Sequence, residues 1–221
     1  MTFSSDAETA MILPVPIAAG AGEDAVDFVA LDGYRRFFDD LEHHFQEIAR
    51  TPGLMGGFGL TSSEVLHVRH VGAFEASFVP HMGLWDRLDA RFRIPANVWD
   101  HLPTYKSFGF VVFKLQSGKH QKAHPMAFSF PTRDPETLFF PTVHIHDGTV
   151  PEDALFDHTF YTQNHPRRDS SSTVPFWMPS VSPASKFLSV RRAHGLIDGS
   201  AICWQGALQG MSRNADTLVR I

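Results

Sequence analysis

Three closely spaced stretches decide the predicted fold: FVVFKL at residues 110–115, MAFSF at residues 126–130 and LFFPTVHIH at residues 138–146. Each stretch is short and rich in β-branched and aromatic residues, and short polar connectors separate it from the next. This pattern is typical of successive β-strands. We therefore predict an antiparallel meander over residues 110–146.

Strand-like and helical patterns extend outward from this centre. Six further strands are predicted at residues 11–17, 65–71, 74–80, 157–163, 201–209 and 216–221. Prolines at positions 14 and 16 indicate that the first of them is an edge strand or a strand end, because proline cannot donate to a ladder. Apolar residues at steps of three and four predict a helix over residues 33–48, and shorter helices are predicted near residues 84–92, 96–102 and 182–194.

The order of these elements predicts the fold class and the domain organisation. About nine strands and about four helices, with the strands clustered in the middle, indicate an α+β fold with a mostly antiparallel sheet against which the helices pack. We expect a single domain over residues 1–221, and a weak likeness between residues 11–41 and 74–88 leaves open two similar lobes. A Pro/Ser-rich loop is predicted at residues 164–183.

Composition and charge exclude several classes of function. The net charge is -5 in a chain that is 43% hydrophobic, so no basic surface indicates nucleic-acid binding. No apolar run approaches the length of about 18 residues that a membrane span requires. The single cysteine, Cys203, rules out an intramolecular disulfide framework, and no targeting segment is visible at the amino terminus. We therefore expect a cytoplasmic protein.

The strongest chemical signal is a cluster of histidines in a chain that contains 13 of them. His144 and His146 would project from the same face of one strand, about 6–7 Å apart. Neutral imidazoles in this arrangement can chelate zinc, copper or iron. We expect His158 on the next strand or His124 on the preceding one to supply a third ligand. Asp147 would bind the metal or orient a histidine.

Two classes of function stay open on these residues. The first is a histidine-ligated metal-binding protein with hydrolase or oxygenase activity. The alternative is a non-catalytic binding or assembly module that uses Phe176, Trp177 and Met178 together with the edge strand at residues 11–17. Its partner could be a second copy of the chain, which would make the protein a homo-oligomer. The same residues can also have a purely structural role. Strand histidines are often simply half-buried and hydrogen-bonded, and the loop aromatics can fold back onto the core. The substrate or partner, a small molecule or a protein, is not specified by any motif.

Several segments resemble a group of bacterial proteins for which no activity is established. The similar pieces are AMILPVP at 10–16, VGAFEA at 71–76, Tyr105 and Gly109 before FVVFKL, and FFPTVHIHDG at 139–148. The resemblance runs from about residue 10 to residue 163 and implies a shared domain without implying a reaction. Members of the group begin upstream of the position of Met1, so the resemblance also implies that this chain starts within its first strand. A broader family that it resembles more loosely is largely exported, whereas this sequence lacks a signal segment and most of the cysteines.

Overall fold

The computed structural model describes most of the chain, with short gaps. The described residues are 2–5, 9–50, 75–88, 93, 96–115, 118–122, 125–145, 149–167 and 172–221. The strands are β1 (Thr2–Ser5), β2 (Thr9–Val15), β3 (Asp27–Ala30), β4 (Glu75–Val79), β5 (Gly109–Leu115), β6 (Gly118–Lys122), β7 (Met126–Ser129), β8 (Thr137–Phe140), β9 (Asp153–Thr162), β10 (Trp177–Pro179), β11 (Trp204–Arg213) and β12 (Thr217–Arg220). The α-helices are α1 (Phe37–Arg50) and α2 (Ala96–Asp100). The short 3-10 helices are η1 (Asp32–Tyr34), η2 (Met82–Arg87), η4 (Pro103–Ser107), η5 (Ala184–Lys186) and η6 (Val190–Ala193).

The predicted fold class, one mostly antiparallel sheet of about nine strands with about four packed helices, is wrong. The strands of the described part of the chain form five separate sheets of two or three strands each. Their orders are β1-β6, β10-β11-β9, β12-β8, β2-β5-β4 and β3-β7. Among the described helices, α1 is the long one with 14 residues, and α2 has five residues. The protein is a mixed α+β structure that consists mostly of small sheets.

The predicted meander over residues 110–146 fails because its strands do not pair with one another. Instead β5 pairs with β2 and β4, β7 pairs with β3, and β8 pairs with β12 near the end of the chain. Prolines help to keep these strands short, since Pro131 lies just beyond β7 and Pro141 directly follows β8. A proline has no N–H to continue a ladder, so the sheet ends there.

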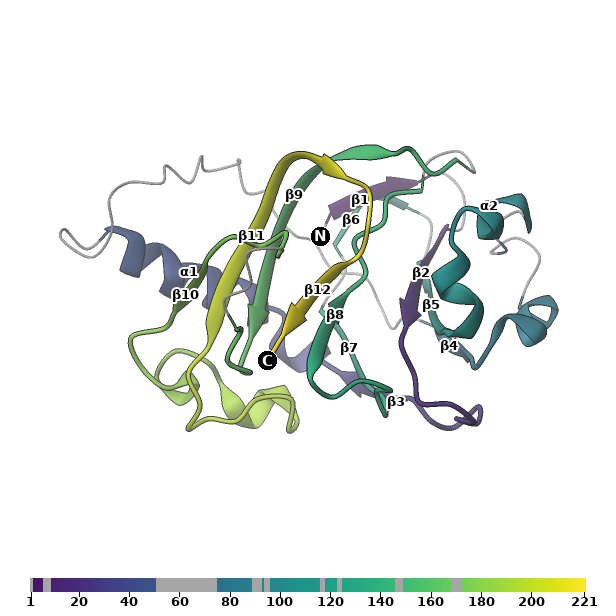
Figure 1. Ribbon diagram of the computed structural model, residues 1–221. Coiled ribbons are helices and arrows are strands. Elements are labelled where there is room, and N and C mark those ends of the chain that lie inside the picture. Colours follow the sequence, from purple (N-terminus) through teal and green to yellow (C-terminus); the bar gives the residue numbers. More distant parts are fainter. Residues whose placement is uncertain are drawn as a thin grey trace.

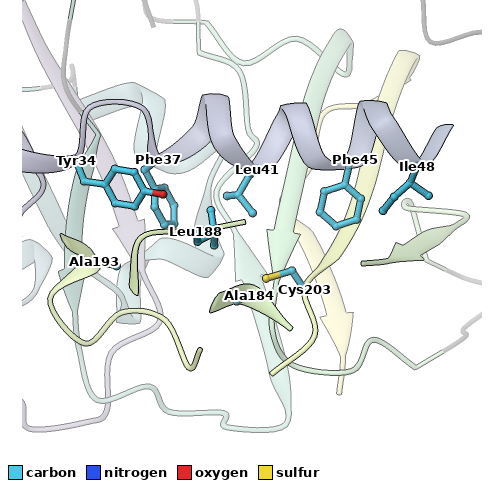
Figure 2. Packing of buried hydrophobic residues seen from close by; sticks show 9 residues of the cluster. All are labelled: Tyr34, Phe37, Leu41, Phe45, Ile48, Ala184, Leu188, Ala193 and Cys203. Carbon is cyan, nitrogen blue, oxygen red and sulfur yellow. The ribbon is translucent and has the colours of Figure 1, made fainter. Parts of the chain in front are cut away.

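The long helix α1 covers one face of the sheet β10-β11-β9 (Figure 1). Its inward residues recur every three or four positions, and Phe45 is fully buried. Figure 2 shows these side chains above Ala184, Leu188 and Cys203, and Tyr161 of β9 and Met178 of β10 pack against the same cluster. The predicted helix at residues 33–48 therefore exists, but its first turn is the separate 3-10 helix η1.

The opposite face of this sheet packs against the segment that carries β8. Phe156 and Phe160 of β9 form a cluster with Leu208 of β11, and Phe140 of β8 packs against it. The neighbouring residue Phe139 points the other way, into a cluster built around η2, α2, η4 and β5. The segment with β8 thus lies between two cores, as its central position in Figure 1 indicates.

The predicted helix at residues 182–194 is replaced by η5 and η6, separated by a short break. At the break, Ser189 donates its backbone N–H to the hydroxyl of Tyr34, 2.8 Å away, instead of continuing a helix. The predicted helix near residues 84–92 is the 3-10 helix η2 as far as it is described, and the predicted strand at residues 65–71 lies outside the described residues. Within the described ranges, no helix is both long and apolar enough to cross a membrane.

Candidate histidine site

His144 and His158 meet between the β8 segment and β9. Their Nε2 atoms lie 3.4 Å apart, and both side chains are half-buried. His158 belongs to β9, which pairs with β11 and not with β8. The two imidazoles therefore approach each other across the space between two packed layers and are not neighbours in one ladder.

His158 occupies a position where the strand pattern favours an apolar residue. On β9 the side chains of Ala154, Phe156 and Phe160 face inward and are buried, and the alternation of the strand puts His158 on the same face. The ring of Phe156 lies 4.8 Å from that of His144 and 5.6 Å from that of His158, measured between centroids. The histidine pair thus rests on a fully buried aromatic ring.

The backbone of His144 is held by the side chain of Asn214, just beyond the end of β11. The Oδ1 atom of Asn214 accepts the backbone N–H of His144 at 2.7 Å, and its Nδ2 donates to the carbonyl of the same residue at 2.9 Å. The same Nδ2 also donates to the carbonyl of Pro151, which lies 2.9 Å away. One amide therefore binds both backbone polar groups of His144.

A buried carboxylate holds the residues just before His144. The Oδ1 atom of Asp216 accepts the backbone N–H of Thr142 at 3.0 Å, and its Oδ2 accepts the hydroxyl of Tyr105 at 2.7 Å. Burial raises the pKa of Asp216, although the hydrogen bonds from Tyr105 and from the backbone oppose the shift. Burial also raises the pKa of Tyr105, as does the neighbouring Asp216 charge. Tyr105 therefore stays protonated and acts as a hydrogen-bond donor.

Part of the predicted ligand set can be placed. His144 and His158 come together, whereas His124, His146 and Asp147 lie outside the described residues, so their role as ligands stays a prediction. The strand predicted over residues 138–146 is wrong beyond β8, which ends at Phe140. In the parts of the chain that are described, no group of three or more His, Cys, Asp or Glu side chains is arranged to hold a metal ion.

The residues of the alternative hypothesis are also placed. Trp177 and Met178 belong to β10 and are half-buried, with Trp177 against Phe140 and Met178 beneath α1. Phe176 is 45% exposed. The strand β2 lies at the edge of its sheet, as the prolines predicted, with β5 as its neighbour.

Sequence reasoning missed Asn214 and Asp216, the residues that shape the site from outside the histidine cluster. Both lie between two strands, where Asn and Asp are common for reasons of turn geometry alone. Nothing in their local sequence distinguishes a turn residue from one that holds a segment 70 residues away. Only the packing of β8 against β12 brings them there.

Comparisons with protein-family models, with curated proteins and with solved structures find no match to this chain.

Proposed function

We propose that the protein binds a divalent transition-metal ion through the Nε2 atoms of His144 and His158. The observation that carries the proposal is their separation of 3.4 Å. Two nitrogen ligands at about 2.0–2.1 Å from a tetrahedral ion lie about 3.3–3.4 Å apart. The same separation also fits a long N–H···N hydrogen bond between the two rings, and metal uptake distinguishes the two.

The position of His158 supports the same proposal. A polar ring between Phe156 and Phe160 interrupts the apolar inward face of β9. Such departures from a local pattern are expected at functional sites more than elsewhere in a fold. A shared ion would use the electron pairs of both rings.

Zinc, copper and iron are the ions whose chemistry suits imidazole ligands. A catalytic metal site has three protein ligands and an open position, so one of the predicted ligands His124, His146 and Asp147 would complete the set. An ion held in this way would supply the chemistry for activating water or for binding oxygen. The proposed activity is accordingly that of a metal-dependent hydrolase or oxygenase. Within it, His144 and His158 hold the ion, and Phe156 shields one side of the pair from water.

Metal uptake by the untagged protein tests the proposal. Protein dialysed against Zn²⁺, Cu²⁺ or Fe²⁺ and then against buffer should retain one ion of at least one of these metals per chain, measured by mass spectrometry of the elements. His158→Gln should reduce the retained metal to near zero, because a single remaining imidazole is a poor site.

His101→Gln is the matched control, because His101 is exposed and belongs to neither of the segments that carry His144 and His158. This variant should retain as much metal as the wild type. Occupancy near zero in the wild type with all three metals, or equal retention by His158→Gln, would overturn the proposal.

A further inference from the structure

We infer that Asn214 is the positioning residue of the histidine site, so that its side-chain amide sets the affinity for the metal. The inference rests on the proposed function of His144 and His158. Asn214 touches neither imidazole in any described contact and would act entirely through the backbone of His144.

The geometry fixes His144 at both of its backbone polar groups. A side-chain amide that accepts from the N–H and donates to the C=O of one residue mimics one rung of a β-ladder. With both groups held at 2.7 and 2.9 Å, the peptide planes on either side of His144 cannot rotate freely. The direction of its Cα–Cβ bond, and hence of its imidazole, is set by this clamp.

Asn214 also connects this backbone to the strand that carries the second histidine. Its Nδ2 donates to Pro151, and its own N–H donates to the carbonyl of Glu152 at 2.8 Å, directly before β9 begins. The segment with His144 and the start of the strand with His158 are therefore both tied to one residue. Losing that residue would release the two imidazoles from a common frame.

A second amide clamp in the same protein provides a matched control. The side chain of Gln163 donates to the carbonyl of Asp198 at 2.8 Å and accepts its N–H at 2.9 Å, the same two bonds as at His144. Neither residue takes part in the histidine pair. Removing this clamp removes equivalent hydrogen bonds without touching the proposed site.

The test compares Zn²⁺ affinity, by calorimetric titration of folded protein at low temperature, among the wild type, Asn214→Ala and Gln163→Ala. Asn214→Ala should bind Zn²⁺ about 10-fold more weakly or worse, the usual effect of losing a residue that orients a ligand. Gln163→Ala should bind as the wild type does. A purely structural role would lower the unfolding temperature of both variants and leave both affinities unchanged.

Asn214→Asp covers the case in which the alanine variant does not fold. It keeps the acceptor for His144 N–H but places a carboxylate oxygen against two carbonyl oxygens, so it should also bind Zn²⁺ more weakly. If the wild type binds Zn²⁺ and a folded Asn214 variant binds it with the same affinity, the positioning role alone would be overturned. Absence of Zn²⁺, Cu²⁺ and Fe²⁺ binding in the wild type would overturn the proposed function and the positioning role together.

Discussion

At the scale of single residues, the packing around Gly206 explains why a glycine lies in the middle of β11. Gly206 is buried and is the direct partner of Trp177 on β10. A Cβ atom there would lie 2.7 Å from Val174 Cγ1 and 2.9 Å from two ring atoms of Trp177. The indole therefore occupies the space that any other side chain would need.

Gly206→Ala should destabilise the protein by about 1–3 kcal/mol, because overpacking forces the indole or the strand to shift. The measurement is the free energy of unfolding in urea. Gly22→Ala is the control, since a Cβ at Gly22 meets nothing within 4 Å, and it should change that free energy by less than about 0.5 kcal/mol. Equal effects of the two substitutions would refute this account of Gly206.

His44 is a second residue whose surroundings determine its chemistry. Its ring stacks flat on Phe187, with centroids 3.8 Å apart, and its Nε2 is buried without a hydrogen-bond partner among the described residues. Burial lowers the pKa of His44 below the usual 6.5, although the charge of Glu47 opposes the shift. The folded protein therefore binds this proton less tightly than the unfolded chain does.

Stability should fall as the pH falls through 6.5 towards the lowered pKa, because protonation then favours the unfolded state. His44→Phe keeps a ring on Phe187 and removes the titrating group, so it should make the unfolding free energy less dependent on pH in this window. Urea unfolding at pH 8 and at pH 5.5 measures the difference. Phe38→Leu, at an exposed position of the same helix that carries no titrating group, should keep the pH dependence of the wild type.

At the scale of elements, α1 shows how burial divides residues of one type on one helix. Phe45 is fully buried in the cluster of Figure 2, whereas Phe38 is 51% exposed. Both are phenylalanines of the same helix, so intrinsic helix propensity is the same for the two. The two residues differ in burial, so truncating Phe45 would leave a cavity in the core, whereas truncating Phe38 would not.

Phe45→Ala should destabilise the protein by about 3–5 kcal/mol, the usual effect of removing a buried aromatic side chain. Phe38→Ala is the matched control and should cost less than about 1 kcal/mol, since half of its surface is already in water. Denaturant unfolding followed by circular dichroism measures both. A similar loss in the two variants would show that α1 does not pack as described.

At the scale of the whole molecule, the hydrogen bond between Tyr105 and Asp216 joins parts of the chain 111 residues apart. Tyr105 belongs to η4 and is buried in the cluster around β5, and Asp216 lies between β11 and β12. The small sheets share no ladder in the described structure. Side-chain bonds of this kind, isolated backbone bonds such as those between residues 16–18 and 131–133, and the apolar clusters connect them.

Tyr105→Phe should destabilise the protein by about 1–3 kcal/mol at pH 7, because a buried carboxylate loses a donor. The tyrosine hydrogen bond lowers the pKa of Asp216, so the variant raises that pKa further. A carboxylate with a raised folded pKa loses stability as the pH rises from about 3.8 through that pKa. The difference between wild type and variant should therefore be larger at pH 7 than at pH 4.

Tyr161→Phe is the control for this prediction. Its hydroxyl accepts a hydrogen bond from the neutral side chain of Gln205 at 3.1 Å, so no carboxylate loses a donor. The effect of Tyr161→Phe on unfolding free energy should be the same at the two pH values. A pH-independent effect of Tyr105→Phe would contradict the assignment of the buried charge to Asp216.

Local sequence patterns predicted individual helices and strands better than they predicted which strands pair with one another. The period of α1 and the apolar run of β5 are visible in the sequence because each element buries a face whatever it packs against. Residues 182–194 show the limit of such patterns. The predicted helix there is divided into η5 and η6, and at the break the backbone N–H of Ser189 donates to the hydroxyl of Tyr34, 155 positions away.

The sequence alone determined the α1 helix and the histidines available to a site, since these follow from periodicity and from composition, and its prolines restricted β2 to the edge of a sheet or to a strand end. Tertiary structure alone decided that β8 pairs with β12, that His144 meets His158 across two layers, and that Asn214 holds His144. The physical reason is that short strands pair with whichever distant edge buries their apolar face and satisfies their backbone groups. No local pattern encodes that choice.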